Sequence, residues 1–86
     1  MEVGVLGVLE FNSIAAGIEA LDFMVKAAPV KIVDAKTICP GKFLILITGD
    51  VAAVDASLSA GKRDREAYLI DELFPVSYTH LRAHET

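Results

Sequence analysis

The sequence has 86 residues, of which 53% are hydrophobic, and a formal net charge of −4. This length corresponds to one small domain, and the negative charge argues against nucleic acid or an anionic membrane as a partner. The longest apolar runs, such as Phe43 to Ile47, are far shorter than the roughly 20 residues of a membrane-spanning helix. Glu2, where a secretory signal carries basic residues, and the single cysteine together predict a reduced, cytoplasmic protein. The high apolar fraction fits either a compact core with few loops or a domain whose flanks are buried in an oligomer.

The first half of the chain predicts a strand, a helix and a second strand. Residues 2–11 have the pattern of a half-exposed strand. Asn12 or Ser13 is a suitable N-cap for a helix over residues 13–28, which Pro29 ends. Apolar residues at helical spacing predict the helix face that packs on the sheet: Ile14, Ile18, Leu21, Val25 and Ala28. Residues 30–38 predict a second strand of mixed polar and apolar pattern.

The second half predicts a hairpin partner, a helix and a last strand. Residues 42–48 have a nearly continuous apolar sequence, which predicts a central strand covered on both faces. Asp50 is a suitable N-cap for a helix over 51–60, with Gly61 at its C′ position and a buried stripe of Val51, Val54 and Leu58. We expect the charged segment 62–66 to be solvated and residues 67–74 to form the last strand. The order β-α-β-β-α-β predicts an α+β, ferredoxin-like fold, with an antiparallel sheet and two helices on one face.

The last eleven residues depart from this pattern. They have no apolar periodicity, and their sequence resembles a peptide translated from sequencing-adapter DNA. We therefore expect one domain over residues 1–75 and a tail over residues 76–86 that is adapter-derived or disordered. His80 and His84 in this tail are two potential metal ligands at i,i+4, but two ligands without a third make a weak site.

No motif of an enzyme is present, and we predict no catalytic residue. Gly4 and Gly7 do not form the G-x-G-x-x-G fingerprint that opens a helix in dinucleotide-binding domains. The aspartates are best explained as exposed or capping residues. Cys39, followed by Pro40 and Gly41, is the exception. A free cysteine is most often a small buried apolar residue, but on a turn at a rotation axis three copies of its thiolate could hold three irons of a cubane cluster.

Several segments resemble the shell domain of bacterial microcompartments. They are residues 4–10 (GVLGVLE), 22–28 (DFMVKAA) and 49–54 (GDVAAV). The stretch 36–44 (KTICPGKFL) is more specific, because it is similar to the first domain of the PduT-type tandem-domain shell proteins. The resemblance covers residues 1–75.

This resemblance implies a non-enzymatic, structural protein of a cytoplasmic microcompartment shell, as in propanediol utilisation. Tandem chains of this type form trimers, or pseudohexamers, that tile with other shell proteins into hexagonal sheets. The resemblance implies that Cys39 is the metal ligand of a [4Fe–4S] cluster shared between subunits, for electron transfer or cluster delivery to a redox enzyme in the lumen. It also implies that Lys26 lies at the edge between tiles, and that the pore loop consists of Thr37, Ile38, Cys39, Pro40 and Gly41. The chain has one shell domain where this type has two.

Two alternatives remain open at this stage. The first is a metal-free shell protein in which Cys39 is only a pore residue and the pore gates the passage of metabolites. The second is a small ferredoxin-like regulatory domain that binds a metabolite between subunits and stays a discrete dimer or trimer in solution.

Overall fold

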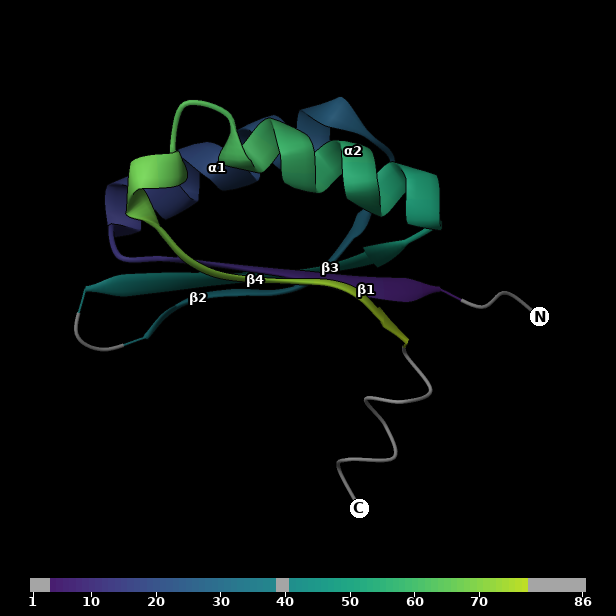
Figure 1. Cartoon of the computed structure of the whole chain (residues 1–86), viewed down its shortest axis with the longest axis horizontal. Coiled ribbons are helices and arrows are strands. Elements are labelled where there is room, and N and C mark those ends of the chain that lie inside the picture. Colours follow the sequence, from purple (N-terminus) through teal and green to yellow (C-terminus); the bar gives the residue numbers. More distant parts are fainter. Residues whose placement is uncertain (1–3, 39–40, 78–86) are drawn as a thin grey trace, which may run out of the picture.

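A four-stranded antiparallel sheet forms one layer of the fold and two helices form the other (Figure 1). The computed structural model describes residues 4–38 and 41–77. In chain order the elements are β1 (Val5–Phe11), α1 (Ile14–Ala27), β2 (Lys31–Ile38), β3 (Lys42–Gly49), α2 (Val51–Lys62), a 3-10 turn (Glu66–Tyr68) and β4 (Leu69–Ser77). This architecture confirms the predicted βαββαβ fold with both helices on one face.

The strand order is β2-β3-β1-β4, and every neighbouring pair is antiparallel. The β1–β3 register runs without interruption from Val5↔Gly49 to Phe11↔Phe43. Both edge strands carry irregularities: β2 shifts register against β3 between Ile32 and Asp34, and β4 shifts twice against β1. The long hydrophobic strand β3 is central, as predicted.

The prediction that β3 is covered on both faces is wrong for the single chain. Its buried residues Phe43, Ile45 and Ile47 alternate with half-buried ones such as Leu44 and Leu46. The helices cover only the first set (Figure 1). A continuous apolar run therefore marks a strand whose second face is open in the isolated subunit.

The face of α1 that packs on the sheet differs from the predicted one. The buried residues are the small ones and a methionine: Ala16, Gly17, Ala20 and Met24. Among the predicted core residues, Leu21 does pack against the core and Ala28 is half-buried, whereas Ile14, Ile18 and Val25 are 38%, 55% and 46% exposed. The small residues of α1 face the sheet because the helix lies very close to β3. A Cβ on Gly17 would lie only 2.5 Å from the Cβ of Phe43.

The buried stripe predicted for α2 is confirmed in part. Val54 and Leu58 are buried, but Val51 is 55% exposed. Gly61 is not a C′ residue, since it lies inside the helix, where a Cβ would meet Met24 Cγ at 2.6 Å. The buried Ser57 hydroxyl donates to the Met24 carbonyl at 3.0 Å and joins the two helices.

The ends of the elements follow local capping rules. Ser13, one of the two predicted caps, accepts a hydrogen bond at its Oγ from Ala16 N–H at 3.2 Å. Asp50 occupies the predicted N-cap position of α2 but makes no side-chain capping bond. The last strand begins at Leu69, after the 3-10 turn, and continues to Ser77 rather than ending at residue 74.

Two predictions concern residues outside the described part of the chain. His80 and His84 of the predicted tail lie there, and so do Cys39 and Pro40. Within the described residues, neither helix is long and apolar enough to cross a membrane.

Candidate functional site

The hairpin between β2 and β3 carries most of the predicted site residues. The two strands remain paired up to Ile38 and Lys42, so the three residues 39–41 join them. The last of these, Gly41, has φ 70°, and apart from Gly41 and its two chain neighbours no described atom lies within 4 Å of the place where a Cβ would be. A glycine in the left-handed region is typical of three-residue hairpin loops.

The described pore-loop residues flank this turn. Thr37 is exposed opposite Phe43, Ile38 is half-buried opposite Lys42, and Gly41 is exposed. The hairpin thus brings three of the five predicted residues together at one end of the sheet, while Cys39 and Pro40 lie outside the described part. Within residues 4–38 and 41–77, no group of three His, Cys, Asp or Glu side chains could hold a metal ion.

Lys26 belongs to another part of the molecule, the last turn of α1. Its Nζ lies 3.0 Å from Asp22 Oδ2, and the two side chains are 70% and 57% exposed. An exposed i,i+4 pair of this kind contributes little to stability, roughly 0.3–0.5 kcal/mol. Its exposure leaves the ammonium group accessible to another molecule.

Arg65 was missed by the sequence analysis, which expected the segment 62–66 to be solvated. It is only 6% exposed. Its Nε donates to the Gly61 carbonyl at 2.8 Å and its Nη2 to the Ala60 carbonyl at 3.1 Å. Its Nη1 donates to Glu19 Oε1 at 2.8 Å, and the guanidinium lies 4.7 Å from the ring centre of Phe23.

Arg65 therefore closes the carboxyl end of α2 and ties it to α1. The signal that could have identified it is a basic residue a few positions after the end of a helix, since such a side chain can fold back on the last carbonyls. Lys62 makes a second contact from this segment, an ion pair with Glu72 of β4 at 2.9 Å. Lys62 and Arg65 are thus structural, whereas Arg63, Asp64 and Glu66 are exposed to solvent as predicted.

Comparisons with known proteins agree with this geometry. Residues 5–77 match the BMC domain family. The bacterial microcompartment shell protein PduT of Citrobacter freundii is 47% identical over 68 residues, which cover 79% of this chain and 37% of that protein. The shell protein EutM of Salmonella typhimurium is 38% identical over 87 residues, covering 85% of this chain and 91% of EutM.

A solved structure shares the fold. The crystal structure of a microcompartment protein from Desulfitobacterium hafniense DCB superimposes with a TM-score of 0.80 at 49% identity, over 84% of this chain and 40% of that one. The chain thus spans well under half the length of PduT and of this protein. Because the family match covers all four strands and both helices, the chain belongs to the BMC domain family.

Proposed function

We propose that the chain is a structural, non-catalytic subunit of a bacterial microcompartment shell in the cytoplasm. It assembles with copies of itself and with other shell proteins into hexagonal tiles around a central pore. The proposal is supported by the BMC domain match and by the shell proteins PduT and EutM among its relatives.

The observation that carries the assembly proposal is the apolar surface of the single chain. Among the described residues, nine large hydrophobic side chains are at least 38% exposed, including Ile18, Val51 and Leu73 at 51–55%. These residues come from α1, β2, α2, the 3-10 turn and β4, so they are spread over several elements of the domain. Large apolar side chains exposed on several elements support a subunit whose flanks are buried in an oligomer.

The β2–β3 hairpin is the segment that we propose to line the pore. Thr37 and Gly41 are exposed on either side of the turn, with Ile38 half-buried next to them. The open space around Gly41 allows another molecule to approach the backbone closely. Lys26, exposed on α1, is proposed to contact the neighbouring tile.

Cys39 is proposed as the ligand of a [4Fe–4S] cluster in the full-length parent protein. Such clusters are held by cysteine thiolates, and the chain has one cysteine. Because the chain has a single cysteine, the donor set fits a cluster only where thiolates from several copies converge. This chain's contribution would be the sulfur of Cys39, which lies between β2 and β3 in the sequence. When bound, the cluster would supply one-electron transfer through the pore.

Anaerobic reconstitution of the full-length parent protein with iron and sulfide tests the cluster. We expect about four irons for every three chains in the assembled fraction, since three thiolates would hold one cubane. Cys39→Ser should bind none, whereas Thr37→Ser, a control in the same hairpin, should keep the iron. Equal iron contents in the wild type and in Cys39→Ser would favour a metal-free subunit whose pore gates metabolites.

Electron microscopy tests the shell assignment separately. A shell subunit should form hexagonal sheets or tubes at high concentration. A discrete dimer or trimer that never extends would contradict the shell assignment and favour a metabolite-binding regulatory domain.

A further inference from the structure

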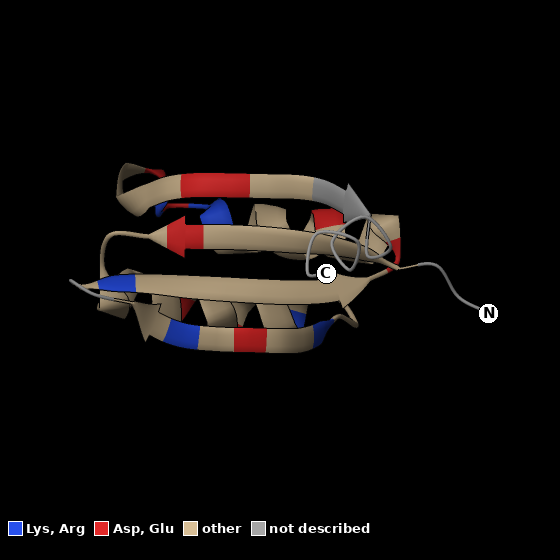
Figure 2. Cartoon of the chain, turned by 90° about the horizontal axis from the view of Figure 1, so that it is seen from below, with Lys and Arg blue, Asp and Glu red and all other residues tan. Residues whose placement is uncertain are grey.

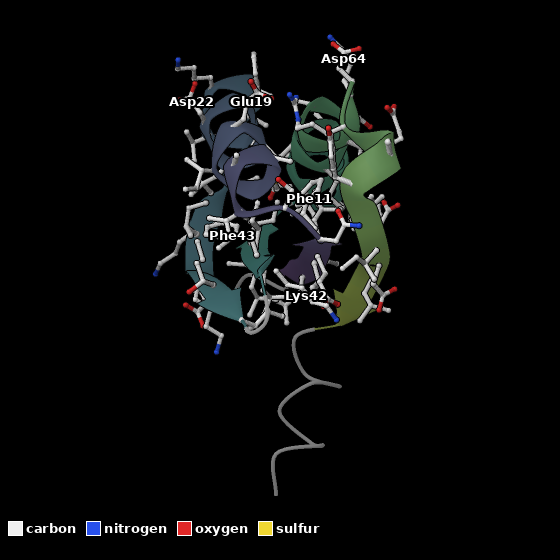
Figure 3. The ribbon with its side chains drawn as sticks, turned by 90° about the vertical axis from the view of Figure 1, so that its left-hand side faces the viewer. Phe11, Glu19, Asp22, Lys42, Phe43 and Asp64 are labelled. Carbon is white, nitrogen blue, oxygen red and sulfur yellow. The ribbon has the colours of Figure 1, made fainter. Side chains whose placement is uncertain are left out.

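The face of the sheet that the helices leave open carries a small cavity at the end away from the β2–β3 hairpin. Figure 3 views the fold from one end and shows Phe43 on the helix side of the sheet and Lys42 on the other side. Because side chains alternate along a strand, Thr48 of β3 lies on the same open face as Lys42. A cavity of about 350 Å³ lies beside it and is lined by Gly4, Lys31, Ile32, Val33 and Thr48.

Three segments that are distant in the sequence form the walls of this cavity. Lys31 and Thr48 are directly opposite each other in the β2–β3 register, so their side chains are neighbours on one face. Gly4 comes from the segment that leads into β1. A Cβ on Gly4 would lie 3.1 Å from Thr48 Oγ1, so the glycine leaves room that a side chain would fill.

The register shift in β2 supplies the aliphatic walls. The register passes from Ile32↔Ile47 to Asp34↔Leu46, so Val33 has no partner on β3. The extra residue of a β-bulge is left out of the ladder and turns its side chain differently from its neighbours. Val33 is 47% exposed, while Ile32 is half-buried and packs against the core. The bulge thus brings two branched aliphatic side chains to the same cavity.

Lys31 is the charged group of the cavity. It is exposed, and among the described residues it takes part in no ion pair. Asp34 of the same strand is already paired with Lys36 at 3.4 Å. Figure 2 looks onto the open face and shows the basic residues of β2 along one border of the sheet. Thr48 adds no free donor, because its hydroxyl donates to the Val5 carbonyl at 2.9 Å.

Aliphatic walls beside a single cationic donor select a class of ligand. A phosphate group binds where several donors or a bidentate arginine converge, and this cavity offers one ammonium group. A carboxylate needs only that one charged partner, and an aliphatic tail gains free energy when the two branched walls remove it from water. The volume is near the lower end of the roughly 300–1,000 Å³ of small-molecule sites, so the tail must be short.

We propose that this cavity binds a short-chain aliphatic monocarboxylate. The carboxylate lies at the Lys31 ammonium group, and the tail packs against Ile32 and Val33. The inference goes beyond the proposed shell function and does not depend on it, because all five lining residues belong to one chain.

Ligand-observed NMR on the full chain tests the site, with saturation transfer from the protein to butyrate as the signal. This signal can be measured whether the chain is a single subunit or part of an assembly. Butyramide, which has nearly the same shape but no charge, separates the aliphatic contacts from the charge. Lys31→Met removes the ammonium group, and Lys36→Met, at another exposed position of β2, is the matched control. Thr48→Leu fills the cavity, and circular dichroism shows whether each variant is folded.

The proposal predicts a specific order of affinities. Butyrate should give saturable transfer with a dissociation constant on the order of 1 mM, as expected of a ligand with few atoms. Lys31→Met should weaken butyrate about fivefold and remove its preference over butyramide, because one exposed charge contact is lost. Lys36→Met should bind as the wild type does, and Thr48→Leu should lose both ligands. Added salt should weaken butyrate and leave butyramide unchanged.

Other outcomes overturn the proposal. Equal affinities of the wild type for butyrate and butyramide would mean an apolar recess without preference for an anion. Equal losses in Lys31→Met and Lys36→Met would mean diffuse attraction to β2 rather than a site. Absence of saturable transfer in the folded wild type would mean that the cavity binds no monocarboxylate. If Thr48→Leu does not fold, the comparison of the two lysine variants still decides. None of these results bears on the shell assignment, which electron microscopy tests separately.

Discussion

The replacement of Arg65 by methionine is the most informative test of the fold. The last four carbonyls of an α-helix have no partner within the helix. In α2 the Ser59 carbonyl accepts from Arg63 N–H and the Lys62 carbonyl from Arg65 N–H. The side chain of Arg65 serves the other two, those of Ala60 and Gly61. Methionine keeps much of the volume of arginine but donates no hydrogen bond.

The expected loss is about 3 kcal/mol of unfolding free energy. Hydrogen bonds that involve a charged group contribute about 1.5–3 kcal/mol each, and two of them would be lost at nearly buried carbonyls. A cation near the negative end of a helix adds about 0.3–1 kcal/mol. The contact of Arg65 with Glu19 adds little, because the Glu19 side chain is 60% exposed. These terms overlap, so we take a value near the lower end of their sum.

Urea unfolding followed by circular dichroism measures this loss. Arg63→Met is the matched control, because Arg63 is an exposed basic residue at the end of the same helix. Its side chain makes none of the hydrogen bonds found here, so a change within about 0.5 kcal/mol is expected. If Arg65→Met lost no more stability than Arg63→Met, the side chain would not be the cap of α2, and water would serve the two carbonyls equally well.

Three further predictions concern α1. Gly17→Ala should lower the free energy of unfolding in urea by about 1–2 kcal/mol, because the new Cβ would clash with Phe43. This cost exceeds the roughly 1 kcal/mol that alanine gains over glycine in helix propensity. A more stable variant would mean that α1 can move away from the sheet. Ser13→Ala should lose about 1 kcal/mol of unfolding free energy with its N-cap bond, and an unchanged denaturation midpoint would speak against that cap. Lys26→Ala should keep the oligomer mass in light scattering but lose extended sheets in electron micrographs, and intact sheets would exclude Lys26 from the tile contact.

The order and type of the elements could be predicted because each has a strong local signal. The apolar run of β3, the N-cap Ser13 and the break at Pro29 are all properties of a few adjacent residues. Such signals depend on hydrophobic periodicity and backbone geometry, which act within one element. The βαββαβ order followed from them directly.

The faces of the helices were less predictable, because they depend on what the helix meets. Large apolar residues in α1 pointed to Ile14 and Ile18 as core, yet the sheet accepts Gly17 against Phe43 at a distance that excludes a larger residue. The predicted end of α2 at Gly61 was wrong for a similar reason, since a glycine near the end of a helix indicates either a C′ residue or a close contact. Here the contact with Met24 decides. The burial of Arg65 could not be predicted from one element, because its side chain contacts both α1 and α2.

The hairpin that contains the proposed pore-loop residues was predictable from the sequence, whereas its role in a pore and its chemistry stay predictions. Residues 36–42 formed a recognisable hairpin with glycine at the position that needs a positive φ. Whether Cys39 binds iron depends on how many copies meet at one axis, which is a property of the assembly. The exposed apolar side chains of a single subunit support the proposed assembly, but the contacts between copies would decide its symmetry.

The register shifts in β2 and β4 have a consequence for how copies can meet. Both edge strands are interrupted, β2 near Val33 and β4 near Leu73. A bulge disrupts the ladder locally and disfavours the pairing of a further strand with that edge. In the proposed assembly we therefore expect neighbouring copies to touch through side chains, and the outward amides of β2 should remain open to hydrogen–deuterium exchange. A shell built this way can be taken apart one subunit at a time, which an unbroken sheet spanning many chains would not allow.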